Sequence, residues 1–255
     1  ALGWTEGGLR GLKAVGRGPR GMRAEKVKKQ GNTAMRRRGW IPVMGPGAPS
    51  AGAGLSEKFG RLTLEKVMEP AVTYAREGYP VSPVISKLCN NAYKEFSGTL
   101  KDECFKPWFD TFARDGHAPQ PGEIWKSEAH AKTLEKIAKT HAKAFYQGEL
   151  GDQIDAYSRK TGGYLRKSDL ENYWCEWVKP IHVNYRGYDI CEIPPNGDGI
   201  IALMALNILK GYSYKDRSCL DTVHKQLEAL KLAFADGNRY VADPGYMRAP
   251  VETLL

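Results

Sequence analysis

Apolar residues recur three and four positions apart along several stretches of the chain, and this spacing predicts amphipathic helices. Residues 56–78 are expected to form two short helices, with Ser56 as an N-cap and Gly78 as the stop. Pro70 is compatible with this pattern in the first turn of the second helix, where its missing N–H costs least.

The clearest helical pattern covers residues 127–148, with Ser127 as the N-cap and Gly148 as the last residue. A short capped turn is expected over residues 167–173. Further helices are expected in 79–97 after an extended start, in 149–163 up to a Gly pair, in 199–212 and in 218–241.

Residues 180–195 alternate between apolar and polar side chains around Arg186-Gly187, which predicts a β-hairpin. Residues 1–54 are rich in Gly, Arg and Pro and are expected to be mostly loop. Helices, then a hairpin, then helices indicate an α/β chain of the layered α+β kind.

The stretch PPNGDG at residues 194–199 joins the predicted hairpin to a helix, as many phosphate-binding loops do. A phosphate loop needs bare backbone N–H groups, and the two prolines remove two of them. Asp198 at the start of the helix would compete with a bound phosphate. The stretch is therefore interpreted as a strand-to-helix turn with Asp198 as the cap.

The charge of the chain is unevenly distributed. Residues 1–38 hold eleven Lys and Arg against two acidic residues, whereas residues 39–255 hold 27 of each. Nucleic-acid affinity depends on Lys and Arg neutralising phosphates along a face, and a neutral body offers no such face. Residues 1–38 are therefore expected to be a solvated basic arm, and a nucleic-acid partner is not predicted. No apolar run is long enough for a membrane helix.

The sequence shows no complete set of catalytic or metal-binding residues. Its five cysteines form no CxxC pair, and none stands at zinc spacing from a histidine. No GxSxG motif is present, and no Cys and His stand at a known catalytic spacing. The sequence therefore predicts no metal, no cofactor and no catalytic residue within this chain.

Four segments, taken in order, resemble the large subunit of the γ-glutamyltranspeptidase family. PGAPSAGAGLSEKFGRLTLEKVMEPAVTYAREGYPVSP (46–83) resembles the family's PGA-containing loop and the helices after it. GEIWKSEAHAKTLEKIAKTHAKAFYQGEL (122–150) resembles its helix ending in Ala-Phe-Tyr-x-Gly. The segment 161–209 resembles the stretch from a Gly-Gly turn through Tyr-Arg-Gly to a Pro-Pro-Asn loop, and 228–246 resembles a late helix.

The resemblance implies part of an αββα sandwich of the N-terminal-nucleophile hydrolases. It implies that a precursor cleaves itself before a Thr, which then attacks a γ-glutamyl amide such as glutathione. The acyl group passes to water or to an amino acid, and no cofactor is needed. That Thr and its supporting groups belong to a small subunit that is absent from this chain. The chain by itself is therefore expected to be inactive.

The resemblance also implies one substrate-binding residue, an Arg followed by a Pro that pairs with the α-carboxylate of the donor. In GRGPR (16–20) this is Arg17, and Arg20 is the second choice. A guanidinium fork matches a carboxylate with two hydrogen bonds.

Two regions are predicted: a basic arm over 1–38 that carries Arg17, and a large-subunit-like domain over 39–255. Two alternatives stay open: an interaction protein or inactive copy that reuses the fold, and a polyanion-binding module using residues 10–38. The chain lacks an initiator Met. The sequence therefore leaves open a periplasmic or extracellular location and a cytoplasmic one.

Overall fold

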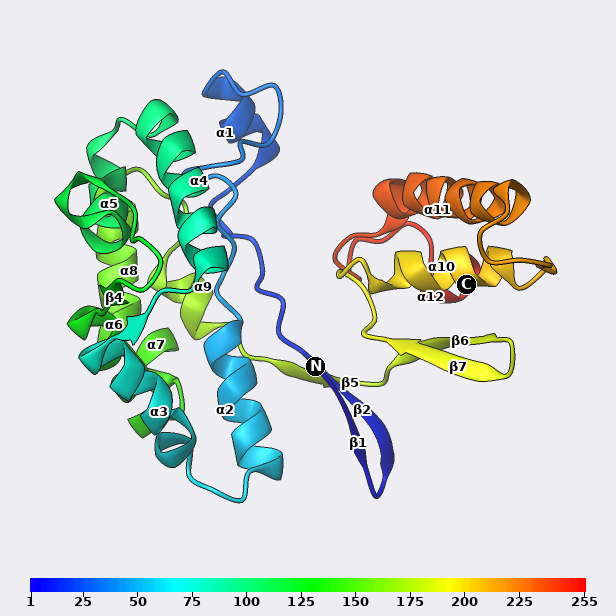
Figure 1. Cartoon of the computed structure of the whole chain (residues 1–255), viewed down its shortest axis with the longest axis horizontal. Helices are drawn as coiled ribbons and strands as arrows, with labels where there is room; N and C mark the ends of the chain where they lie inside the picture. The colour runs from blue at the N-terminus through cyan, green and yellow to red at the C-terminus, as the bar shows by residue number, and fades with distance from the viewer. The chain divides into compact units, whose positions relative to one another are not determined.

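A computed structural model describes residues 1–255, which divide into two compact units (Figure 1). The first unit contains Ala1–Val15 and Trp174–Leu255, and the second contains Gly16–Tyr173. None of the helices combines the length and the apolar character that crossing a lipid bilayer requires.

The first unit begins with an antiparallel sheet in the order β1-β2-β5, formed by Leu2–Thr5, Gly8–Lys13 and Glu176–Val178. Strands β1 and β2 lie in the stretch expected to be loop, so that expectation is wrong there. No local pattern marks these strands, because apolar and polar residues alternate only weakly along β1 and β2. The strands form because β2 pairs with the distant β5, for example with Leu12 opposite Trp177.

The predicted hairpin is present as β6 (Ile181–Tyr185) and β7 (Tyr188–Glu192). Arg186 and Gly187 form its turn with φ of 56° and 89°, which is the backbone of a two-residue type I′ turn. Helix α10 (Gly199–Leu209) contacts both strands of the hairpin and lies alongside α11 (Leu220–Tyr240) (Figure 1).

The helices that follow the hairpin close the first unit. Helix α11 (Leu220–Tyr240) packs on α10 through its small residues, and the short α12 is Val251–Leu254. The core between them is purely apolar and consists of Ile200, Ile201, Met204, Ala205 and Ala233. Apart from Asn207, the side chains of α10 are apolar on all faces, as expected for a helix that packs against the hairpin and α11.

The turn between β7 and α10 matches the predicted strand-to-helix connection in position. Asp198 is the N-cap residue of α10, but its side chain makes no capping hydrogen bond, so the predicted cap bond is wrong. The carboxylate of Glu192 packs against Gly199 at the first turn instead. Lys13 Nζ donates a 2.6 Å hydrogen bond to the carbonyl of Pro195 and ties the turn to β2.

The second unit is mostly helical. Its helices and short strands, in chain order, are α1 (Ala24–Lys29), α2 (Ala48–Phe59), α3 (Leu64–Glu77), β3 (Tyr79–Pro80), α4 (Pro83–Thr99), η1 (Glu103–Phe105), α5 (Lys106–Phe112), η2 (Arg114–Gly116), β4 (Ile124–Trp125), α6 (Glu128–Lys139), α7 (Lys143–Tyr146), α8 (Glu149–Lys160) and α9 (Lys167–Glu171).

Three details of the helix predictions are wrong in this unit. Ser56 lies inside α2 and is no cap; Thr63 caps α3 by accepting from the Lys66 amide. Pro70 lies within α3, which stays continuous through it. The helix predicted over 127–148 begins at the predicted cap Ser127 but ends at Lys139. His141 and Ala142 have φ of 46° and 63°, and a new helix starts after them.

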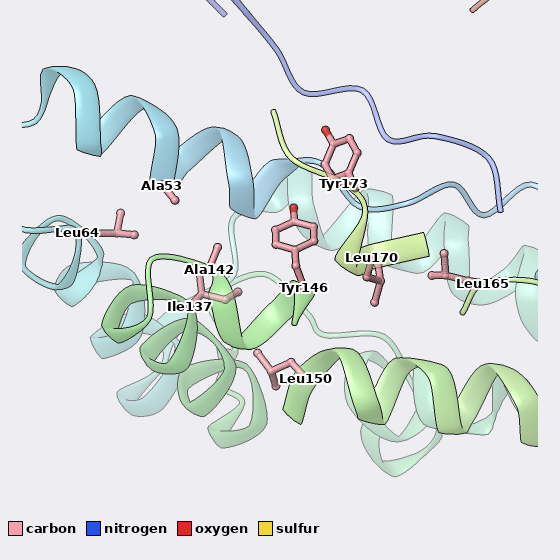
Figure 2. Close-up of a cluster of buried hydrophobic side chains, with 9 residues drawn as sticks. All are labelled: Ala53, Leu64, Ile137, Ala142, Tyr146, Leu150, Leu165, Leu170 and Tyr173. Atoms are coloured by element: carbon pink, nitrogen blue, oxygen red, sulfur yellow. The ribbon is translucent and has the colours of Figure 1, made fainter. Parts of the chain in front are cut away.

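The core of the second unit joins α2, α3 and the segments from α6 to α9 (Figure 2). Its buried side chains are Ala53, Leu64, Ile137, Ala142, Tyr146, Leu150, Leu165, Leu170 and Tyr173. Most of these residues carry no polar atom on the side chain, so the hydroxyl groups of the two tyrosines stand out as groups that need partners.

Candidate functional site

The segment that carries Arg17 lies directly against the loop before α2. A β-carbon at Gly16 would overlap the carbonyl oxygen of Gly45, so only glycine fits at position 16. The amide of Gly45 donates a 2.9 Å hydrogen bond to the carbonyl of Arg17. Gly16 and Gly45 are buried, whereas the Arg17 residue is exposed. The backbone is therefore fixed at a residue that is itself exposed.

The chain turns immediately after Arg17. The Met22 amide donates a 3.0 Å hydrogen bond to the carbonyl of buried Pro19. The Arg20 amide donates to Asp169 Oδ1 at 3.1 Å, and Arg20 itself is exposed. The structure thus places both sequence-predicted arginines on one anchored turn, and both are exposed.

Tyr146 lies in the core and binds the segment around Pro46, which follows Gly45 (Figure 2). Its side chain is 1% exposed, and its hydroxyl donates to the carbonyl of Pro46 at 2.7 Å. The same hydroxyl accepts from the Ser50 amide at 3.1 Å. That amide lies in the first turn of α2, where N–H groups have no partner within the helix. Tyr146 therefore positions the residues next to Gly45, and Gly45 in turn binds Arg17.

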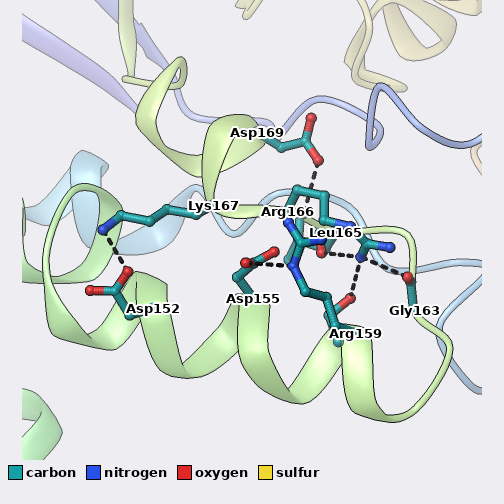
Figure 3. A network of polar contacts seen from close by, with 9 residues as sticks. Asp152, Asp155, Arg159, Gly163, Leu165, Arg166, Lys167 and Asp169 are labelled. Atoms are coloured by element: carbon teal, nitrogen blue, oxygen red, sulfur yellow. Dashed lines mark hydrogen bonds and ion pairs between the residues drawn. The ribbon is translucent and has the colours of Figure 1, made fainter.

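A network of polar contacts fixes the loop between α8 and α9 (Figure 3). Asp169, which accepts from the Arg20 amide, lies on α9 at the end of this loop. Asp169 Oδ2 accepts from the Arg166 amide at 2.9 Å, so one carboxylate joins two separate segments. The Arg166 guanidinium donates through Nη1 to the carbonyls of Gly163 and Leu165, both at 2.8 Å, and to Ser158 Oγ at 3.2 Å. These contacts satisfy carbonyls that the end of α8 and its turn leave open.

Asp155 lies on α8 beside this network. A 2.8 Å hydrogen bond from Arg159 holds the pKa of the Asp155 carboxyl below its usual 3.8, although burial opposes the shift. The backbone amide of Lys167 lowers the same pKa. This cluster stabilises the loop and shows no feature of a reacting centre.

Sequence reasoning found the arginines but missed the residues that position them. Gly45, Tyr146 and Asp169 are distant from Arg17 in the chain, and no spacing pattern links them to it. Only two weak signals in the sequence pointed to these residues. One is the pair of glycines at 45 and 47, and the other is Tyr146, a tyrosine on an apolar helix face whose hydroxyl requires a partner.

The model of the gamma-glutamyltranspeptidase family matches residues 2–255. The chain belongs to this family. The family assignment made from the sequence motifs is therefore confirmed.

Among curated relatives, the chain is 34% identical over 212 residues to the glutathione hydrolase-like YwrD proenzyme of Bacillus subtilis (strain 168), covering 82% of this chain and 39% of the relative. It is 34% identical over 238 residues to the acylase ACY 1 proenzyme of Pseudomonas sp. (strain SE83), covering 91% of this chain and 41% of that protein. The chain thus spans about two fifths of the length of these relatives.

Solved structures agree with the family. Cephalosporin acylase from Bacillus halodurans superposes on the whole chain with a TM-score of 0.97 at 49% identity, over 48% of that chain. Gamma-glutamyltranspeptidase from Helicobacter pylori gives a TM-score of 0.89 at 27% identity, over 73% of its chain. These are N-terminal-nucleophile hydrolases, so the predicted α+β fold class is confirmed. The predicted division at residue 38 and the role of Arg17 stay predictions.

Proposed function

We propose that these 255 residues are the large-subunit portion of a γ-glutamyl transferase or hydrolase whose nucleophilic Thr lies outside this chain. In the proposed reaction the Thr hydroxyl oxygen attacks the carbonyl carbon of the γ-glutamyl amide. The α-amine of the same Thr takes the proton of the hydroxyl. The C–N bond breaks, the amine leaves with a proton, and an ester forms. Water or an amino acid then releases the γ-glutamyl group.

Arg17 is proposed to bind the α-carboxylate of the γ-glutamyl donor. The supporting observation is the contact of Gly16 with Gly45, which fixes the backbone at Arg17, an exposed residue. A charged side chain on a fixed backbone loses less conformational entropy when it binds a carboxylate. Glutathione is the proposed donor, and the small subunit is the proposed partner that completes the site.

A second candidate function is hydrolysis of another acyl amide, such as the side chain of a cephalosporin. The supporting observation is the 49% identity to a cephalosporin acylase, which exceeds the 27% identity to the Helicobacter pylori transpeptidase. Both candidates use the same acyl-enzyme chemistry. They differ in the acyl group of the substrate, and therefore in the group that Arg17 would contact.

The test uses the complete protein that contains this chain, with a chromogenic γ-glutamyl anilide, glutathione and an acylated cephalosporin as separate substrates. Self-cleavage into two bands and release of the anilide are expected. Arg17→Lys is expected to raise KM for the γ-glutamyl donor about tenfold or more, because a lysine cannot replace the two-pronged hydrogen bond. Arg20→Lys is the matched control and should change KM less than twofold, within about 0.4 kcal/mol.

Three outcomes would change the proposal. A larger KM effect at Arg20 would move the carboxylate role to that residue. Turnover of the cephalosporin alone would favour the acylase function. A complete protein that neither cleaves itself nor turns over any of the substrates would indicate an interaction protein built on the fold.

A further inference from the structure

A hollow of about 280 Å³ lies on the second unit, formed by α1 and the residues that surround it. Its apolar lining includes the side chains of Met22, Val27 and Met35. Met22 and Val27 are half-buried, whereas Met35 is 61% exposed. Flexible methionine side chains adapt to ligands of irregular shape.

Two cations belong to the same hollow. Arg23 and Lys28 line it, both residues are exposed, and neither forms an ion pair in the structure. No acidic side chain lines the hollow. Glu25 on α1 is the one acid between residues 16 and 38, and it is not among the lining residues. The hollow therefore combines an apolar surface with unneutralised positive charge.

The hollow begins where the Arg17 turn ends. Met22 lines it, and the Met22 amide closes the turn by donating to Pro19. A β-carbon at Gly18 would lie 3.9 Å from Met22 Cε, so the residue next to Arg17 is in reach of this methionine. A ligand in the hollow would lie beside the anchored turn.

We propose that this hollow binds a small organic anion with an apolar body, such as an aryl or medium-chain carboxylate. The apolar body would cover Met22 and Val27, and the carboxylate would pair with Arg23 and Lys28. In the complete protein this group would be the carboxylate-bearing amine that leaves when an acyl amide such as a cephalosporin is cleaved, and that assignment rests on the second candidate of the proposed function. A nucleic acid fits poorly, because phosphates gain nothing from the apolar lining.

The experiment uses the chain with ¹³C-methyl methionine, and follows the six methionine signals by NMR during titration with octanoate. The signals of Met22 and Met35 should shift with saturation, whereas those of Met68 and Met204 should not. Acetate tests the charge without the apolar body, and octanol tests the apolar body without the charge. Both should bind at least about tenfold more weakly than octanoate.

Two neighbouring lysines provide a matched pair of variants. Lys28→Glu should weaken octanoate binding about tenfold, because the new carboxylate repels the ligand. Lys29→Glu makes the same charge change on the same exposed helix, but Lys29 does not line the hollow, so its effect should stay below about twofold. Circular dichroism of both variants checks that the fold is retained.

The absence of Met22 and Met35 shifts up to about 10 mM octanoate would overturn the proposal. Equal weakening by Lys28→Glu and Lys29→Glu would also overturn it, because binding would then follow net charge alone. The binding measurement needs no turnover, so it is independent of the proposed function. Binding in a complete protein that shows no amide hydrolysis would overturn the assignment of the hollow to the substrate.

Discussion

Gly16 and Gly45 lie in direct backbone contact, so that a side chain at position 16 would overlap the carbonyl oxygen of Gly45. The amide of the same Gly45 binds the carbonyl of Arg17. The conformation of the arginine turn therefore depends on a segment 29 residues further along the chain, which Tyr146 holds in turn.

Gly16→Ala is expected to destabilise the protein by about 2 kcal/mol or more, because the backbone must separate to admit one methyl group. Urea unfolding of the variant and the parent measures this difference. In the complete protein the variant should also raise KM for the γ-glutamyl donor, since Arg17 would move. An unchanged unfolding midpoint would show that the two segments can separate freely.

Tyr146→Phe is expected to lower the free energy of unfolding by about 1–3 kcal/mol. The substitution keeps the ring but removes the hydroxyl that pairs the Pro46 carbonyl and the Ser50 amide, and Ser50 is buried. Chemical denaturation gives the value. Tyr188→Phe is the control, because Tyr188 is 74% exposed and should cost almost nothing. Equal effects at both positions would contradict the role assigned to Tyr146.

Gly52→Ala is expected to stabilise the protein by about 1 kcal/mol. Gly52 lies inside α2, and a β-carbon there would have no neighbour within 4 Å. Gly237→Ala on α11 provides the contrast, because its β-carbon would lie 2.6 Å from Ile201 Cδ1. The Tm of the first variant should rise and that of the second should fall. A fall in both would mean that α2 tolerates no side chain at position 52.

Asp155 should make the free energy of unfolding depend on pH in the acidic range. Because the hydrogen bond from Arg159 lowers its pKa in the folded state, the unfolded state takes up a proton more readily. The stabilisation is present above its usual pKa of 3.8 and is lost as the pH falls through the lower folded value. The partner Arg159 is 62% exposed, so screening keeps the contribution below about 1 kcal/mol.

Urea midpoints between about pH 3 and pH 7 measure this dependence. Asp155→Asn should flatten the acid side of the curve relative to the parent. Arg159→Ala should flatten the curve in the same way, because it removes the hydrogen bond that lowers the pKa of Asp155. A parent and an Asp155→Asn variant with the same slope would contradict the predicted contribution.

The sequence by itself determined the elements whose signals are local. The 180–195 alternation with Arg186-Gly187 gave the hairpin, Ser127 marked the start of α6, and the apolar runs after residue 198 gave α10 and α11. Each rests on contacts between residues close in the chain. The ordered motifs also determined the family, and they pointed to Arg17 by resemblance.

The tertiary structure decided what depends on distant segments. Strands β1 and β2 form where the sequence predicted loop, because β2 pairs with β5 far along the chain. The break at His141–Ala142 places Tyr146 in the core, although the local helical pattern runs through it. The anchoring of Arg17 and the cation-lined hollow beside it also come from packing between segments, for which no local pattern of side chains provides a signal.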